Sequence, residues 1–383
     1  MCLVVASLVM GIWCLAVAGS VSAAPIFAVV ATIPVGTSPI GLAATGNSVY
    51  TTNIGAATVS VIDATSRAVT NTITVGTSPW GIAVGHGFGY VANDSSNSVT
   101  VFDTASNAVI RTVAIGFPTY HSPYGVAEAG GYAYVTDAMS VGNISVIDPN
   151  SNAVLRNITV GSNPAGIAIS GGYAYVANQG GGNVSVVDLN TNTVVATVTV
   201  GSSPNGVAIS DGYVYVTNIG SRTVSVISTA SNTVVHTISV GNAPKGVVVA
   251  GGYVYVANSG DDTVSQIDTA TNLVMATLPV GQGPVGLTVL GNYLYVGNQQ
   301  DSTVSVINIG SPSGIVAPMQ AYVRPIGTSC ANNAPEWVNW PGISTQQYMS
   351  WGQSWQQWPN GNTGGYVCVR QPYYATAGTW SVL

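Results

Sequence analysis

The stretch YVYVTN, residues 213–218, decides the fold, because close copies of it recur along the chain. The copies are YAYVTD (132–137), YAYVAN (173–178), YVYVAN (253–258) and YLYVGN (293–298). In a β-strand, Tyr213 and Tyr215 lie on one face and Val214 and Val216 on the other, so both faces are apolar. A strand of this kind has to be covered on both sides. The recurrence therefore predicts a repeat protein built from sheets that pack against one another.

The repeat has a regular length, which a second motif marks. The motif SPxG or a variant of it places prolines at positions 39, 79, 123, 164, 204, 244 and 284, with spacings of 40, 44, 41, 40, 40 and 40 residues. One unit, residues 200–239, reads VGSSPNGVAISDGYVYVTNIGSRTVSVISTASNTVVHTIS and contains four strand-like runs between turn residues. Four strands in about forty residues are typical of a propeller blade. We predict an all-β, seven-bladed propeller over residues 25–319, with repeats starting near 35, 75, 115, 160, 200, 240 and 280.

The seventh unit is incomplete, and the start of the chain supplies what it lacks. GSPSG follows TVSVIN where the fourth strand of this unit should stand. The segment FAVVATIPVG (27–36) matches the fourth-strand phrase TVVATVTVG (193–201). We therefore expect the strand at residues 27–34 to complete blade seven and close the ring, which removes two open sheet edges.

These repeats resemble the YVTN-repeat β-propeller family, whose name is the tetrapeptide at 215–218, over about residues 27–310. The resemblance implies a seven-bladed propeller that is exported or surface-bound. Members of that family are mostly of uncertain activity, although some similar propellers are lactonases and one branch binds DNA.

Composition argues against several function classes. Of 383 residues only 5% are charged, the net charge is −6, and the seven lysines and arginines are scattered. We therefore expect no nucleic-acid partner, because nucleic-acid binding needs a clustered basic surface. The three histidines lie in different units and no haem attachment motif occurs, so we expect no metal and no cofactor.

The first 24 residues predict export. An apolar run is followed by VSA before Ala24, which is the pattern of a cleaved secretory signal peptide. An uncleaved membrane anchor is the alternative, and the lack of a basic residue before the run fits a truncated start. We predict a secreted, periplasmic or cell-surface protein with no membrane span in its mature chain. Cys330 and Cys368 then remain as a pair, which favours one disulfide over a zinc site with too few ligands.

The residue between Pro and Gly offers a candidate binding site. We call these seven positions the Pro-x-Gly ring: Ile40, Trp80, Tyr124, Ala165, Asn205, Lys245 and Val285. We expect them at one end of the propeller axis, together with His121 from an insertion in unit three. Trp80, Tyr124, His121, Asn205 and Lys245 are our candidate ligand-binding residues, since an apolar concavity with a few polar groups is the usual form of a ligand site. The alternative is that these loop positions simply tolerate variation.

Residues 320–383 abandon the repeat and are rich in tryptophan. Trp351, Trp355 and Trp358 follow Tyr348 at helical spacing, in a segment that begins at Ser344 and ends before Pro359. We predict a small α+β or β-rich domain held by Cys330–Cys368. Its aromatic residues either bind carbohydrate or cell wall, or form the core that a domain of about 60 residues needs.

The sequence favours a non-enzymatic binding protein whose partner at the Pro-x-Gly ring is a small molecule, a glycan or a protein. A lactonase-like hydrolase is the alternative. It is less favoured because no histidine, arginine and carboxylate cluster converges on the axis, so we assign no catalytic residue.

Overall fold

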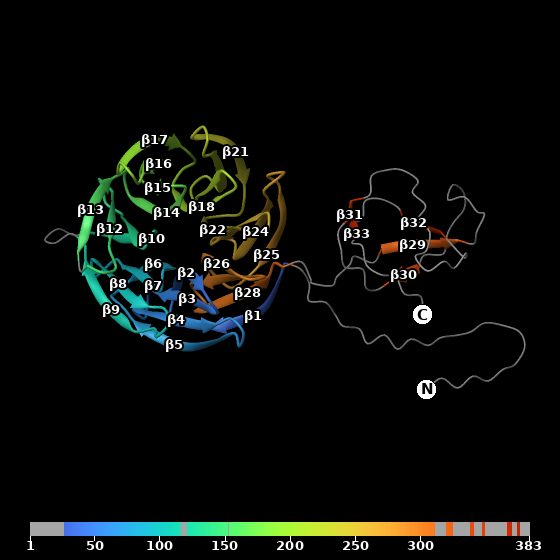
Figure 1. Ribbon diagram of the computed structural model, residues 1–383, viewed down its shortest axis with the longest axis horizontal. Helices are drawn as coiled ribbons and strands as arrows, with labels where there is room; N and C mark the ends of the chain where they lie inside the picture. Colours follow the sequence, from blue (N-terminus) through green and yellow to red (C-terminus); the bar gives the residue numbers. More distant parts are fainter. Residues whose placement is uncertain are drawn as a thin grey trace, which may run out of the picture. The chain divides into compact units, whose positions relative to one another are not determined.

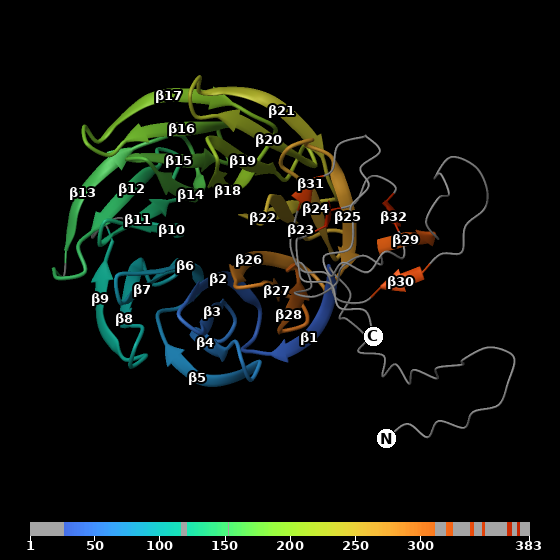
Figure 2. The same cartoon turned by 45° about the vertical axis from the view of Figure 1, so that its right-hand side comes forward.

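The structure of this chain, a computed structural model, describes residues 27–115, 121–151 and 153–310, and the backbone of five short strands between residues 319 and 375. Residues 25–311 form one compact unit. In it, seven four-stranded antiparallel sheets are arranged around an axis, as in a seven-bladed β-propeller (Figures 1 and 2).

The four strands of each blade run from the axis to the periphery. The inner strands are β2 (Pro39–Thr45), β6 (Pro79–Gly85), β10 (Pro123–Ala129), β14 (Pro164–Ser170), β18 (Pro204–Ser210), β22 (Pro244–Ala250) and β26 (Pro284–Leu290). The second strands are β3 (Ser48–Asn53), β7 (Phe88–Asn93), β11 (Tyr132–Asp137), β15 (Tyr173–Asn178), β19 (Tyr213–Asn218), β23 (Tyr253–Asn258) and β27 (Tyr293–Asn298). The third strands are β4 (Thr58–Asp63), β8 (Ser98–Asp103), β12 (Asn143–Ile147), β16 (Asn183–Asp188), β20 (Thr223–Ser228), β24 (Thr263–Asp268) and β28 (Thr303–Asn308). The outer strands are β5 (Ala68–Thr74), β9 (Val109–Ala114), β13 (Val154–Thr159), β17 (Thr193–Thr199), β21 (Thr233–Ser239), β25 (Val274–Pro279) and β1 (Ala28–Pro34).

The hydrophobic core lies between blades. Tyr215 and Val224 of blade five pack in one buried cluster with Val254 and Ile267 of blade six, and the same arrangement recurs around the ring. The repeated YVYV phrase is therefore covered on both faces, as predicted, with one exception. This exception is the first tyrosine of the phrase, which lies at the end of the second strand opposite the asparagine: Tyr213 is 41% exposed, and Tyr132 and Tyr173 are each 40% exposed.

Blade seven is completed by the start of the propeller. β1 pairs antiparallel with β28, and the N–H of Phe27 donates to the Asn308 carbonyl at 2.7 Å. Ile33 of β1 is buried in the cluster that joins blades seven and one. In Figure 1 the blue β1 accordingly lies beside the orange β28.

Glycine is needed in the Pro-x-Gly motif because neighbouring inner strands approach closely there. A Cβ atom on Gly206 would collide with the carbonyl oxygen of Lys245 in the next blade, and the other six motif glycines face the next blade in the same way. In blades one, three and five a threonine hydroxyl reinforces this contact. Thr217, for example, accepts from the N–H of Gly206 at 2.8 Å and donates to the Lys245 carbonyl at 2.6 Å.

The remaining described segments are short strands known by their backbone. β29 (Met319–Arg324) pairs with β30 (Val338–Trp340) and β32 (Tyr366–Val369), and β31 (Gln347–Tyr348) pairs with β33 (Tyr374–Ala375). The helix predicted from Ser344 is therefore wrong at Tyr348, where strand pairing replaces it. The rest of that helix, residues 1–24 and Cys330 lie outside the described residues, as do the side chains of Cys368, Trp351, Trp355 and Trp358. In the part that the structure does describe, no helix has the length and apolarity that a membrane crossing requires.

Candidate functional site

The candidate site is the end of the propeller axis at which the inner strands begin. Each inner strand starts at the motif proline, which pairs with the last residue of the second strand, as Pro204 does with Asn218. The Pro-x-Gly ring thus lies at the same end of the propeller as the asparagines that close the second strands. Ile40, Ala165, Asn205 and Val285 of the ring are buried, while Trp80, Tyr124 and Lys245 are half-buried.

Two aromatic rings of adjacent blades stack at this end. The rings of Trp80 in blade two and Tyr124 in blade three have centroids 4.5 Å apart and planes 26° apart. The Trp80 carbonyl accepts a 2.6 Å hydrogen bond from Thr52 of blade one, which fixes the backbone that carries the indole. One face of each ring is therefore occupied by the other, so the pair forms a single fixed surface rather than two free aromatic side chains.

Asn205 of blade five is the polar neighbour of Tyr124. Burial raises the pKa of the Tyr124 hydroxyl, and the Asn205 side chain opposes that rise. The site therefore combines the stacked pair of blades two and three with a buried amide of blade five.

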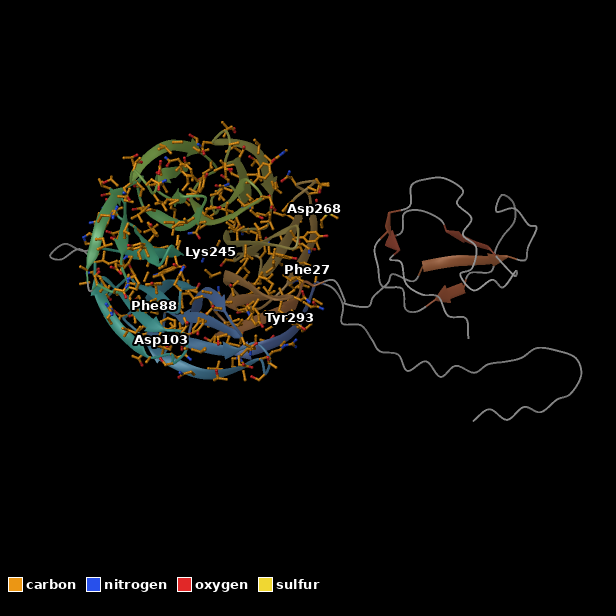
Figure 3. All side chains as sticks on the ribbon, in the orientation of Figure 1. Phe27, Phe88, Asp103, Lys245, Asp268 and Tyr293 are labelled. Carbon is orange, nitrogen blue, oxygen red and sulfur yellow. The ribbon has the colours of Figure 1, made fainter. Side chains whose placement is uncertain are left out.

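Lys245 of blade six supplies the positively charged group among the candidate residues at this end of the axis. It is the chain's single lysine. Figure 3 shows it close to the axis. Burial lowers its pKa, and burial is the sole cause that acts on it.

Blade three departs from the repeat next to the aromatic pair. Its second strand ends in Asp137 instead of asparagine, and the buried carboxylate of Asp137 contacts Nδ1 of His121. The same carboxylate accepts from the N–H of Ser122 at 2.8 Å, while the Ser122 hydroxyl donates to Asp94 of blade two at 2.5 Å. Asp137 is 1% exposed and His121 is 15% exposed. A histidine oriented by a buried carboxylate is an arrangement suited to proton transfer.

The asparagines at the same position of the other blades are structural. Asn218 Nδ2 lies 3.0 Å from both Thr223 Oγ1 and Ser225 Oγ. Contacts to the side chains five and seven residues further on recur at Asn53, Asn93, Asn178, Asn258 and Asn298, where Asn178 contacts the amide oxygen of Asn183 in place of the first hydroxyl. In the orientation of Asn53 that satisfies all its polar atoms, the amide also donates to the Gly36 carbonyl at 3.3 Å. The side chain therefore ties the start of the third strand to the loop before the inner strand.

The five candidate ligand-binding residues lie at this end of the axis, in three groups. Trp80 stacks on Tyr124, whose pKa Asn205 lowers; His121 belongs to the Asp137 group; and Lys245 stands apart. Sequence reasoning missed Asp94, Ser122 and Asp137 as members of the site. The signal was available in blade three, which combines an aspartate in place of asparagine with a histidine in its inserted loop.

Two other features of the propeller carry less chemistry. Asp261 and Asp262 accept backbone N–H bonds from Asn242 and Gly283. Among the described residues no group of three metal-ligating side chains occurs. At the opposite end of the axis, a depression of about 490 Å³ lies between blades four and five, and its lining includes Tyr173, Tyr175 and Asp211.

Comparison with known proteins supports the fold. Three segments of the chain match the LVIVD repeat, a β-propeller repeat family. They are residues 162–190, 241–264 and 285–316, which overlap blades four, six and seven. The finer resemblance to the YVTN-repeat family stays a prediction. No curated protein matches the chain.

Among solved structures, the chain is similar to one described as Kuenenia stuttgartiensis hydrazine synthase. The TM-score is 0.62 and the sequence identity 22%, over 71% of this chain and 95% of that chain. At this identity the likeness concerns the propeller fold alone.

Proposed function

We propose that this protein is an exported, non-enzymatic binding propeller that holds a small molecule with a flat ring at the Pro-x-Gly ring. The observation that carries the proposal is the stacked pair Trp80–Tyr124, in which the Thr52 bond fixes the backbone of Trp80. Fixed aromatic surface of this kind binds flat ligands at little entropic cost, because the side chains lose no further freedom on binding. Export rests on the predicted signal peptide at residues 1–24.

Binding is tested by ligand-observed NMR with the full-length protein and a panel of aromatic and sugar ligands. Trp80→Ala should weaken the binding of a flat ligand about tenfold, since loss of stacking on an aromatic ring costs on the order of 1 kcal/mol or more. Tyr213→Ala is the matched control, because Tyr213 is exposed at the opposite end of blade five. Equal affinity for the wild type and Trp80→Ala would place the site elsewhere, with residues 320–383 as the next segment to delete.

A second candidate function, a lactonase-like hydrolase, has one observation in its favour. His121 beside the buried Asp137 is positioned to act as a general base close to the aromatic pair. Turnover of lactones or esters that is lost in both His121→Gln and Asp137→Asn would support this activity. Turnover that is absent in the wild type, or unchanged in both variants, would reject it.

A further inference from the structure

Lys245 is a half-buried cation without a partner, whereas the two half-buried arginines of the described propeller each have one. Arg67 lies over the Tyr293 ring at 4.8 Å, Arg111 donates to the Ser151 carbonyl at 3.2 Å, and His86 contacts Glu128 at 2.8 Å. For Lys245 the described part of the chain provides neither a hydrogen bond nor an ion pair to its ammonium group. A half-buried ammonium without a counter-ion is unfavourable, because it has lost water and gained nothing in exchange.

The backbone of Lys245 is held firmly, so the side chain cannot simply move away from the axis with its strand. Its carbonyl accepts the 2.6 Å hydrogen bond from Thr217 and packs against Gly206 of blade five. The proline before it pairs with Asn258 within blade six. Thus Lys245 starts from a fixed point on the inner edge of the ring.

The acids at the same end of the axis are already used. Asp137 is taken by His121 and the N–H of Ser122, and Asp94 accepts from the Ser122 hydroxyl. Asp261 and Asp262 of blade six, the blade of Lys245, accept the backbone N–H groups of Asn242 and Gly283, and Asp301 of blade seven accepts that of Gln282. The carboxylates at this end are therefore engaged in other bonds, and among the described residues none of them forms an ion pair with Lys245.

We propose that Lys245 binds the carboxylate of the ligand, so that the propeller takes a flat-ringed organic acid in preference to a neutral molecule of the same shape. This inference rests on the proposed function and deepens it by naming the ligand's charge. The neighbouring donor and stacking groups suit such a molecule, since the Asn205 amide is polar and Trp80 is aromatic. A bound carboxylate restores the interaction that the ammonium lost on burial.

The first test uses ligand pairs that differ in charge alone. Calorimetry or ligand-observed NMR compares indole-3-acetate with indole-3-acetamide, and benzoate with benzamide, on the full-length protein. We expect each acid to bind at least tenfold more tightly than its amide. Lys245→Met should remove this preference while leaving the affinity for the amide unchanged, and Lys245→Arg should keep part of it. Equal affinity for acid and amide in the wild type, or an acid preference that survives in Lys245→Met, would overturn the inference.

The second test measures the pKa of Lys245 directly by NMR. The measurement is simple because the chain contains a single lysine. Reductive methylation with ¹³C-formaldehyde gives one dimethyl-lysine signal, separate from that of the terminal amine. In the free protein, titration of this signal should give a pKa below the ordinary value for lysine, and benzoate or acetate should raise it. A pKa that neither anion changes would contradict an anion site at Lys245.

The two tests separate this inference from the proposed function. If acid and amide bind equally and Trp80→Ala weakens both, the ring site stands and the inference about charge is wrong. If no flat ligand binds but acetate shifts the Lys245 signal, the ring site fails and the anion site stands.

Discussion

The hydroxyl of Thr217 donates a 2.6 Å hydrogen bond to the carbonyl of Lys245, and so joins the second strand of blade five to the inner strand of blade six. Thr52 and Thr136 make the same bond to Trp80 and Ala165, at 2.6 and 2.7 Å. In blades two, four and six alanine occupies this position (Ala92, Ala177 and Ala257), so the bond occurs at alternate blade boundaries.

Removing one of these hydroxyls should destabilise the ring measurably. Thr217→Ala leaves the buried carbonyl of Lys245 without its donor, and we expect the free energy of unfolding to fall by about 1–3 kcal/mol. Denaturant unfolding followed by circular dichroism measures the change. Thr237→Ala, on the exposed outer strand of the same blade, is the control and should stay within about 0.5 kcal/mol of the wild type. A loss at Thr217 no larger than at Thr237 would mean that the hydrogen bond contributes nothing net.

We expect β1 to be important for the stability of the propeller, although it is the first strand of the chain. Ile33→Ala opens a cavity in the cluster between blades seven and one, at an expected cost of about 2–5 kcal/mol. Val29→Ala on the same strand removes a side chain that is 38% exposed and serves as the control. Deletion of residues 25–34 should lower the melting temperature far more than deletion of residues 320–383. Similar melting temperatures for the two deletions would contradict closure by β1.

Lys245 should cost stability when no ligand is bound. Its pKa is lowered by burial, so the folded state disfavours the charged form, and each unit of lowering corresponds to about 1.4 kcal/mol. The cost is fully present below the lowered pKa and disappears as pH rises toward the unfolded value of about 10.4. We therefore expect Lys245→Met to raise the melting temperature at pH 7 and to lose this advantage above about pH 10.

Lys245→Arg retains the charge and is the comparison for Lys245→Met. It should show no gain in melting temperature at neutral pH. A melting temperature for Lys245→Met below that of the wild type at pH 7 would indicate that the ammonium has a stabilising partner after all.

The turns after the third strands should weaken in acid. The backbone N–H of Ser106 donates to the Asp103 carboxylate at 2.7 Å and holds its pKa below the usual value, and Asp63 and Asp268 are lowered by the same kind of bond. A lowered carboxyl pKa adds stability above the unfolded value of about 3.9, and this stability is lost as pH falls through the folded value. Asp103→Ala should therefore lower the melting temperature at pH 6 and have little effect at about pH 2.

Ser228 stands at the same position in blade five and provides a control without a titrating group. Ser228→Ala should have the same small effect at both pH values. An effect of Asp103→Ala that does not change between pH 6 and pH 2 would show that the carboxylate charge is not what stabilises the turn.

The propeller fold could be predicted from the sequence because the same local pattern recurs in seven repeats. The four runs of each unit, the turn aspartates such as Asp103 and the pairing of residues 27–34 with the end of blade seven can all be read from spacing and residue type. A strand with apolar residues on both faces leaves few architectures open, and a closed ring of blades is one of them.

The site was less predictable, because its contacts join different repeats. Spacing along the chain placed Trp80 and Tyr124 in one ring but could not show that they stack on each other, since this depends on how neighbouring blades are rotated. The influence of Asn205 of blade five on the pKa of Tyr124 in blade three joins two units, a relation that no single repeat contains. Likewise, Asp137 is a member of the site through its contact with His121, a contact that spacing along the chain does not reveal.

The bond between the N–H of Phe27 and the carbonyl of Asn308 places the two ends of the propeller chain side by side. Every blade contacts its neighbours through the same inner-strand contacts. The stability of the propeller therefore depends more on having all seven blades in a closed ring than on where along the ring the chain begins. A circular permutant that joins residue 308 to residue 27 and opens in an exposed turn such as Asp211–Gly212 should therefore fold to the same ring. Nature could likewise insert this propeller into a surface loop of another protein, since both its ends leave from one place.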